Sequence, residues 1–345
     1  MSPSRRPRAP APDVAVSATT FGALTPDRVI AAVEQTLGVA CSNLCRPLNS
    51  YINRVYEVGL AEGGSVVAKF YRPGRWSRSG LQDEIDFLQE LHAAEVPVVA
   101  PLAGAGGSLL HACDGIAFAV FPKKGGRPLE EPDAGAWEQL GRLIARMHLV
   151  GLRRAPADRI RLHPCHATRA HLAYILASGA LPERMQRAYR DAVETIIARI
   201  APLFDSTELF RIHGDCHAGN ILCRPGEGYH LIDFDDMATG PAVQDLWLLL
   251  PGRLADARTE AACLLEGYES MLAFPRATLR LIEPLRAMRF IHFTAWCVRQ
   301  QADGAFARLP VDWGTPDYWR HETAALETQG HEIEDALVLA RPAGF

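Results

Sequence analysis

The second half of the chain carries a polar cluster whose residue types suit phosphoryl transfer. The segment 213–220 reads HGDCHAGN, and a second acidic segment, 230–236, reads HLIDFDD. Both border apolar, β-rich runs, where charged side chains are costly unless they are paired or bound to metal. Phosphoryl transfer asks a protein mainly to position groups and to neutralise charge, and this set of carboxylates with one amide can do both.

Three side chains of the cluster have the spacing that this chemistry needs. Asp215 is predicted to face the acceptor hydroxyl and to accept its proton. Asn220 and Asp233 offer the hard oxygen ligands that Mg²⁺ prefers, so Asp233 is predicted both as a catalytic residue and as a metal ligand. A D-x-x-x-x-N spacing followed by an aspartate also occurs in protein kinases, whereas an isolated HGD tripeptide is usually a simple turn.

Two residues in the first half of the chain could bind the phosphates of ATP. Lys69 ends the apolar run VVAK, which would project its ammonium into a cleft, within reach of phosphate oxygens. Glu84 lies on the next helix and could pair with Lys69, although Asp83 and Asp86 lie close to it. The alternative for Lys69 is an exposed strand lysine, and the downstream cluster makes that alternative the weaker one.

The sequence has no G-x-G-x-x-G loop to cover the phosphates. The segment 47–56, PLNSYINRVY, is predicted to contact the phosphates instead. A short turn that contains hydroxyl or amide side chains can also offer backbone N–H groups to phosphate. Ser50 is the predicted phosphate contact and Asn53 the second candidate, with local turn capping as the alternative for each. Residues 119–122 (AVFP) are predicted to lie beside the adenine.

Around these residues the chain changes from a β-rich to a helix-rich pattern. Thr25 and Pro26 are typical of a helix start and Gly38 of its end. The next segments predict an antiparallel hairpin over 50–71, a helix over 78–94, and short strands over 96–102 and 116–121. Beyond a Pro- and Gly-rich boundary at 122–133, helices are predicted over 134–150, 168–178, 183–203, 242–250, 256–273 and 278–301.

This order of elements predicts an α+β protein with two lobes and a site in the cleft between them. Residues 1–21 are expected to form a flexible tail. Residues 22–124 would form a small β-rich N-lobe that binds the nucleotide. Residues 125–345 would form a larger helical C-lobe with the catalytic and acceptor-binding groups.

Three further residues lie on the predicted helices of the C-lobe. Asp245 begins the helix that follows the acidic segment 230–236, called the metal segment below. A buried carboxylate there could accept N–H bonds from the catalytic loop at 213–220. Arg286 and Arg289 share one face of a late helix. They are expected as surface or structural arginines, with binding of an acidic substrate group as the alternative.

Composition and charge exclude several classes of function. A net charge of −4 over 345 residues gives no general attraction to nucleic acid or anionic membranes. No apolar run is long enough for a transmembrane helix or a secretory signal. The eight cysteines lack zinc-finger spacing. We therefore expect a cytoplasmic, monomeric protein with reduced thiols, in which Cys216 fills a tight loop or serves as a regulatory thiol.

Together the motifs resemble the aminoglycoside phosphotransferase and choline kinase superfamily, whose catalytic loop reads H-G-D-x-H-x-x-N. The chain is more similar still to the bacterial stress response kinase A family of YihE-type protein kinases, from about residue 22 to residue 325. The resemblance is carried by PLNSYINRVYEV (47–58), VVAKFYRPGRW (66–76), EVPVVAP (95–101), FAVFPKKGGR (118–127), RIHGDCHAGNIL (211–222), GPAVQDLWLLL (240–250) and IEPLRAMR (282–289).

The resemblance implies a protein-kinase-like two-lobed fold and a cytoplasmic, ATP-dependent serine/threonine protein kinase active in stress survival. By position, Asp215 matches the family's proton acceptor and Ser50 its ATP-contact serine. Asn220 and Asp233 match its Mg²⁺ ligands. The DFDD segment at 233–236 departs from the DFG of typical protein kinases, so their activation-loop logic is not carried over.

Three other interpretations of these residues stay open. A small-molecule kinase, acting on the hydroxyl of an aminoglycoside, choline, homoserine or a sugar, would share the site and differ in its acceptor pocket. A metallohydrolase would use His213, Asp215 and His217 as ligands, although the sequence lacks the further histidines that such sites usually need. A pseudokinase would bind nucleotide without turnover, and the presence of Lys69, Asp215, Asn220 and Asp233 argues against it.

Overall fold

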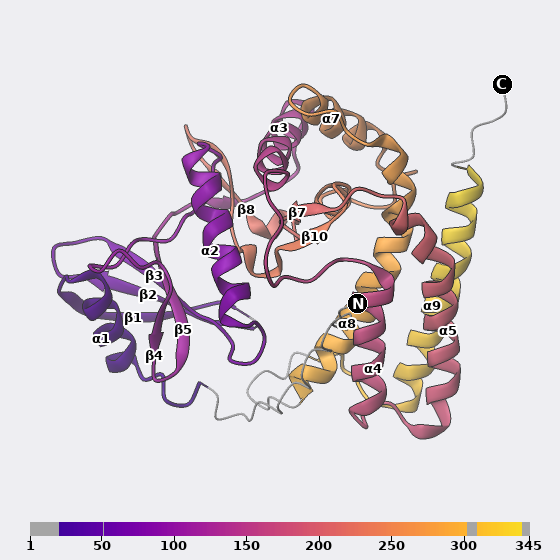
Figure 1. Cartoon of the computed structure of the whole chain (residues 1–345), viewed down its shortest axis with the longest axis horizontal. Helices are drawn as coiled ribbons and strands as arrows, with labels where there is room; N and C mark the ends of the chain where they lie inside the picture. The colour runs from indigo at the N-terminus through magenta and orange to yellow at the C-terminus, as the bar shows by residue number, and fades with distance from the viewer. Residues whose placement is uncertain (1–20, 51, 302–308, 340–345) are drawn as a thin grey trace, which may run out of the picture.

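The computed structural model describes residues 21–50, 52–301 and 309–339 (Figure 1). The predicted tail over residues 1–21 therefore lies outside the described residues except for Phe21. A β-rich lobe and a helical lobe lie on either side of one long helix, α2 (Arg78–Ala93). The expected α+β fold, with a small N-lobe and a larger helical C-lobe, is confirmed.

The N-lobe is an antiparallel sheet with the strand order β1-β2-β3-β5-β4. One helix, α1 (Pro26–Leu37), precedes the sheet; it begins at Thr25, whose side chain accepts the N–H of Arg28, and ends at Gly38 in the left-handed conformation. The predicted hairpin corresponds to β2 and β3. The strands are β1 (Cys41–Leu48), β2 (Arg54–Leu60), β3 (Ser65–Phe70), β4 (His111–Cys113) and β5 (Ile116–Pro122).

The C-lobe is mostly helical, with two small sheets that carry the polar segments. Its helices are α3 (Ala134–Gly151), α4 (Arg169–Ala177), α5 (Glu183–Asp205), α6 (Gln244–Trp247), α7 (Arg258–Glu269), α8 (Ile282–Gln301) and α9 (Pro316–Leu339). Its strands are β6 (Arg127–Pro128), β7 (Phe210–Ile212), β8 (Ile221–Arg224), β9 (Gly228–Leu231) and β10 (Ala238–Gly240). β10 pairs with β7, and β8 lies between β6 and β9.

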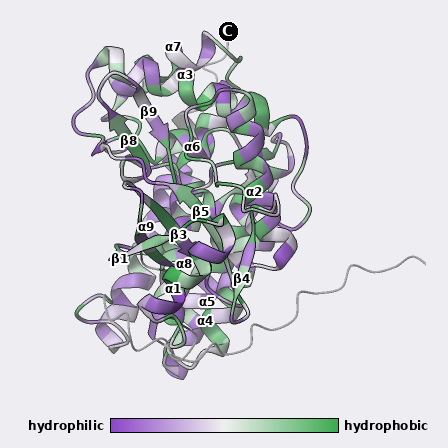
Figure 2. Ribbon diagram, turned by 90° about the vertical axis from the view of Figure 1, so that its left-hand side faces the viewer, coloured by the Kyte–Doolittle hydropathy of each residue, from purple (hydrophilic) through white to green (hydrophobic). Residues whose placement is uncertain are grey.

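Two apolar clusters hold these elements together. One joins α1 to a face of the sheet through residues such as Val33, Ala68 and Phe118, and the central strands β3 and β5 are largely hydrophobic in Figure 2. The other is larger, and it includes Ile85 and Leu88 of α2 together with the buried residues of the C-lobe helices. The core of α2 is therefore continuous with the C-lobe.

Two predicted elements differ from the structure, and one helix was not predicted. The segment 96–102 is not a strand, because Pro97 and Pro101 have no N–H to donate; it makes one isolated bridge, from Val98 to β9. The helix expected over 242–250 is reduced to α6, since the bonds that follow span three residues rather than four. Helix α9 was not predicted, because buried Thr323 and Gln329 interrupt its apolar face.

The cysteines agree with the expectation of reduced thiols. All eight cysteines lie within the described residues, and none of them forms a disulfide. Cys216 is fully buried, and burial raises the pKa of its thiol, which favours the loop-filling interpretation over a reactive thiol. Among the described residues, no helix is long and apolar enough to cross a membrane.

The close approach of α3 and α7 gives a stability prediction (Figure 1). A Cβ at Gly141 would lie 2.0 Å from the carbonyl oxygen of Leu264 on α7. Gly141→Ala should therefore lower the free energy of unfolding by about 1–3 kcal/mol through overpacking, although alanine favours an isolated helix. Chemical denaturation measures this, with Gly135→Ala as the control, because a Cβ at Gly135 meets no atom closer than 3.5 Å. Equal stability of both variants would contradict the prediction.

Candidate active site

Strand β3 places Lys69 between acids from both lobes. Its Nζ lies 3.1 Å from Glu84 Oε1 on α2 and 2.9 Å from Asp233 Oδ1 in the C-lobe. Because side chains alternate across a strand, Lys69 points away from the face on which Ala68 and Phe70 pack against α1. Burial by itself would lower the pKa of Lys69, but the neighbouring carboxylates, Asp233 foremost, raise it well above its ordinary value. The ammonium therefore stays charged.

The acids of α2 next to Glu84 have other partners, which shows which of the three acids pairs with Lys69. Asp83 accepts the backbone N–H groups of residues 157 and 158 at 2.9 and 2.7 Å. Asp86 pairs with an arginine of the same loop. Only Glu84 of the three contacts Lys69, so the predicted pairing is confirmed.

Two arginines that the sequence did not single out complete the network. Arg75 lies 2.9 Å from a carboxylate oxygen of Asp235 and also contacts Asp236. Arg159 donates to Glu84 at 3.0 Å and to the backbone oxygen of Asp235 at 2.6 Å. Burial would raise the pKa of Asp235, but the surrounding cations, Arg75 first, lower it. The cations thus neutralise a cluster of buried acids.

Asp233 itself has an unusual backbone conformation. Its φ of 58° and ψ of 72° lie in the left-handed region, which costs a non-glycine residue free energy and is concentrated at functional sites. Its side chain is 53% exposed, and its contact with Lys69 uses Oδ1. The carboxylate of Asp233 is therefore exposed enough to coordinate a bound metal ion as well.

His213 connects the two polar segments. Its Nε2 donates to the backbone oxygen of Ile232 at 2.9 Å, and its Nδ1 accepts the N–H of Asp215 at 3.3 Å. The ring also packs on Phe234, with centroids 4.5 Å apart. One buried imidazole therefore fixes the backbone on both sides of the site, next to Asp215 and next to Asp233.

Asp245 holds the backbone of the same loop, as predicted. Its two carboxylate oxygens accept the N–H groups of His213 and Gly214, each at 2.8 Å, and His148 Nε2 lies 3.0 Å away. Gly214 has a φ of +85°, and a Cβ there would lie 2.1 Å from the backbone oxygen of Asp236. Only glycine fits at this point of the loop.

Asp215 has donors on both of its carboxylate oxygens. Oδ1 lies 2.8 Å from Arg289 Nη1, and Oδ2 lies 3.4 Å from His217 Nε2. The N–H of Gly219 is donated to His217 Nδ1, so the proton of a neutral imidazole is on Nε2 and points to Asp215. Burial would raise the pKa of Asp215, but the bonds with His217 and Arg289 lower it below its ordinary value. The group is a carboxylate at neutral pH.

Asn220 and Asp233 fit the donor set of Mg²⁺ in a nucleotide complex. The amide nitrogen of Asn220 donates to the backbone oxygen of Asp215 at 2.9 Å, which leaves its carbonyl oxygen as a possible ligand. Magnesium bound to nucleotides takes one or two protein oxygens and completes its shell with phosphates and water.

The residues fit the metallohydrolase alternative poorly. Within the described residues there is no group of three or more His, Cys, Asp or Glu side chains that could hold a metal. Both ring nitrogens of His213 are already engaged in hydrogen bonds. The His213, Asp215 and His217 set is therefore a poor candidate for a hydrolytic metal centre.

The two predicted phosphate contacts between β1 and β2 differ in position. Asn53 is buried, and its side-chain oxygen accepts the N–H of Arg72 at 3.0 Å, so it has a structural role. Ser50 is half-buried, and its neighbour Tyr51 lies outside the described residues. The structure brings Lys69, Glu84 and Asp233 together. It records no hydrogen bond of the Ser50 side chain to another described residue, and the role of Ser50 stays a prediction.

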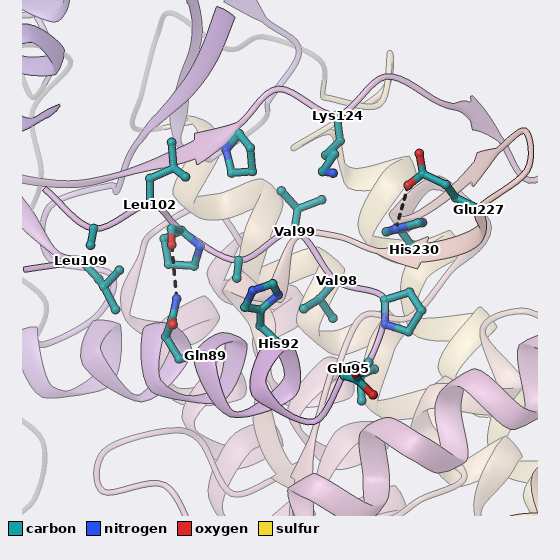
Figure 3. A pocket seen from close by; sticks show the side chains of 16 residues that line it. Gln89, His92, Glu95, Val98, Val99, Leu102, Leu109, Lys124, Glu227 and His230 are labelled. Atoms are coloured by element: carbon teal, nitrogen blue, oxygen red, sulfur yellow. Dashed lines mark hydrogen bonds and ion pairs between the residues drawn. The ribbon is translucent and has the colours of Figure 1, made fainter. Parts of the chain in front are cut away.

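A cavity of about 760 Å³ lies between the end of α2, the segment that follows it and the end of β5 (Figure 3). The extended segment 96–103 forms one wall, and side chains such as His92, Lys124 and His230 form the rest. Gln89 donates to the backbone oxygen of Pro101 across this wall at 3.2 Å. The cavity shares no residue with the network around Lys69, but Pro122, from the segment predicted to lie beside the adenine, lines it.

Comparison with known proteins agrees with the geometry. The phosphotransferase enzyme family matches residues 44–281. Stress response kinase A of Escherichia coli K12 is 38% identical over 94% of this chain and 97% of its own. The serine/threonine protein kinase RdoA of Salmonella typhimurium LT2 is 36% identical over the same shares.

Solved structures show the same fold at lower identity. An amicoumacin kinase in complex with AMP-PNP, Ca²⁺ and Ami has a TM-score of 0.70 at 19% identity, covering 90% of this chain and 93% of its own. A microcompartment-associated aminopropanol kinase has a TM-score of 0.68 at 18% identity, covering 90% and 98%. From the family match and the near full-length relatives, we conclude that the chain belongs to the phosphotransferase enzyme family, in the branch of the stress response kinase A proteins.

Proposed function

We propose that this protein is an ATP- and Mg²⁺-dependent kinase that phosphorylates serine or threonine hydroxyls of a protein during a stress response. The convergence of Lys69, Glu84 and Asp233 beside the loop of Asp215 supports the transfer chemistry. The names of the relatives, stress response kinase A and serine/threonine protein kinase RdoA, support the acceptor class and the setting.

The N-lobe residues would bind and orient the nucleotide. Lys69 presents its ammonium to the α- and β-phosphates, and Glu84 keeps that ammonium in place at 3.1 Å. Ser50 would contribute at the turn between β1 and β2. Because Lys69 already contacts Asp233, phosphate and metal binding would occur at adjacent points of one site.

The C-lobe residues would act on the acceptor. Asp215 would hold the hydroxyl and accept its proton, while the hydroxyl oxygen bonds to the γ-phosphorus and ADP leaves. Asn220 and Asp233 would hold Mg²⁺, which neutralises charge on the phosphates when bound. Asp245 and His213 would fix the backbone that carries Asp215.

A small-molecule acceptor is the second candidate. The structures with the same fold include kinases whose names give small acceptors, such as aminopropanol and spectinomycin. The same transfer site would serve both acceptor classes, so the choice depends on the surface beside Asp215. We further propose a monomer that works in the cytoplasm and binds neither nucleic acid nor membrane.

Acceptor profiling with labelled ATP tests the proposed activity. Purified protein should transfer label to serine or threonine of protein substrates, and EDTA should stop the transfer. Label in aminoglycosides, choline or homoserine, with none in proteins, would favour the small-molecule alternative. No transfer to any hydroxyl would contradict both.

Asp215→Asn should slow phosphate transfer by roughly 10²- to 10⁴-fold, since an amide cannot accept the hydroxyl proton. Nucleotide affinity should stay unchanged, because Asp215 does not contact Lys69 or Asp233 in the described network. Steady-state kinetics and calorimetry measure the two quantities. Asp191→Asn, on the exposed face of α5, is the control, and near-normal turnover of Asp215→Asn would refute the assignment.

Asp233→Asn should weaken Mg²⁺-dependent nucleotide binding by about tenfold or more, because it removes the charged metal ligand. Calorimetric titration with nucleotide, in Mg²⁺ and in EDTA, gives the difference. Asp215→Asn should retain the full Mg²⁺ effect in the same titration. If both variants bound like the wild type, the ligand assignment would be wrong.

Asp245→Asn should lower the free energy of unfolding by about 1–3 kcal/mol, because the buried amide nitrogen would face a backbone N–H in place of an acceptor. Turnover should also fall, since His213 and Gly214 lose a common anchor. Denaturation and kcat are the readouts. A variant as stable and active as the wild type would show that the loop holds its conformation without Asp245.

A further inference from the structure

Helix α8 provides an arginine that reaches the candidate base. Arg289 Nη1 donates to Asp215 Oδ1 at 2.8 Å, from a position 74 residues further along the chain. The side chain of Arg289 is 42% exposed, and Asp215 is its ion-pair partner within the described residues. A guanidinium has five N–H donors, so most of them remain available beside Asp215.

The neighbouring Arg286 shows what a structural arginine on this helix looks like. Its Nε donates to Glu283 at 3.2 Å, and its guanidinium lies 4.9 Å from the centre of the Trp247 ring. Its side chain is half as exposed as that of Arg289, 20% against 42%. The two arginines are one turn apart, yet only Arg289 faces the site. Arg289 is thus exposed, as expected, but unlike Arg286 it also contacts the candidate base.

The charges on the side of the site next to α8 are paired but unevenly exposed. Arg75 lies between Asp235 and Asp236, and its side chain is largely buried. Arg289 reaches Asp215 from a half-exposed position. A negatively charged acceptor would therefore reach the guanidinium of Arg289 more readily than that of Arg75.

Aromatic side chains extend the same stretch of α8 away from Asp215. Phe293 is 48% exposed and stacks on Trp296, with ring centroids 5.6 Å apart. Arg299 lies 4.4 Å from the ring centre of Tyr174 on α4. Exposed aromatic surface beside arginine is typical of protein recognition sites. An acceptor segment could thus combine an ionic contact with apolar packing.

We propose that Arg289 recognises an acidic side chain of the acceptor, so that the kinase selects serine or threonine hydroxyls flanked by aspartate or glutamate. This inference rests on the proposed protein kinase function. Without acceptor, the guanidinium pairs with Asp215. The acceptor carboxylate takes over the guanidinium in a charge-assisted pair, and the freed oxygen of Asp215 receives the hydroxyl.

Positional-scanning peptide libraries with one fixed serine or threonine test the inference. The wild type should select Asp or Glu over Asn or Gln next to the hydroxyl, by roughly 10- to 100-fold in kcat/KM. Arg289→Gln should bring this ratio close to one, and Arg289→Glu should shift the selection to Lys or Arg. Arg286→Gln is the matched control and should keep the wild-type ratio, since a ratio is insensitive to partial unfolding.

Each other outcome has a defined meaning. An acidic preference that survives in Arg289→Gln would overturn the inference, as would a wild type without such a preference. Equal losses of kcat on acidic and neutral peptides would place Arg289 on the transferred phosphate and not on the acceptor, which also overturns it. Label in no peptide at all would contradict the proposed protein kinase activity itself, as distinct from the role of Arg289.

Discussion

The buried ammonium of Lys69 is the charge on which the arrangement of the two lobes depends. It lies between Glu84 and Asp233, so one side chain of the sheet links α2 to the metal segment of the C-lobe. Loss of Lys69 or Glu84 would leave a buried charge without its closest partner on the other element, which is far more costly than loss of an exposed pair. The surrounding arginines, Arg75 and Arg159, extend this balance to the acids that follow Asp233.

A second set of buried bonds fixes the catalytic loop independently of that charge network. His213 joins the backbone at Asp215 to the backbone at Ile232, and Asp245 holds the first two residues of the HGD segment. The groups proposed to react are thereby carried on a backbone that other residues hold in place. Such separation of reacting and supporting groups keeps the reacting oxygens accessible.

The sequence was informative where function depends on short spacing and failed where it depends on distant contacts. The Lys69–Glu84 pair and the anchoring by Asp245 could be predicted, since alternation on a strand and buried acids near a loop leave a local pattern. Arg159 reaches the site from a segment far along the chain, and its own neighbours contain no signal of this. For Arg289 the sequence offered binding of an acidic substrate group only as the alternative, because its contact with Asp215 joins distant segments. Segment 96–102 was misjudged because its apolar residues suit a strand whereas its prolines prevent pairing.

Helix α2 is fastened to the C-lobe along most of its length. Its apolar residues belong to the C-lobe core, Asp83 accepts two backbone N–H groups of the loop at 157 and 158, and Glu90 contacts Arg211 of β7. Many protein kinases are switched off by swinging the corresponding helix outward. Here that movement would expose the apolar residues that α2 buries in the main core and would break the contacts of Asp83 and Glu90. An outward movement of this helix is therefore a costly way to switch this protein off.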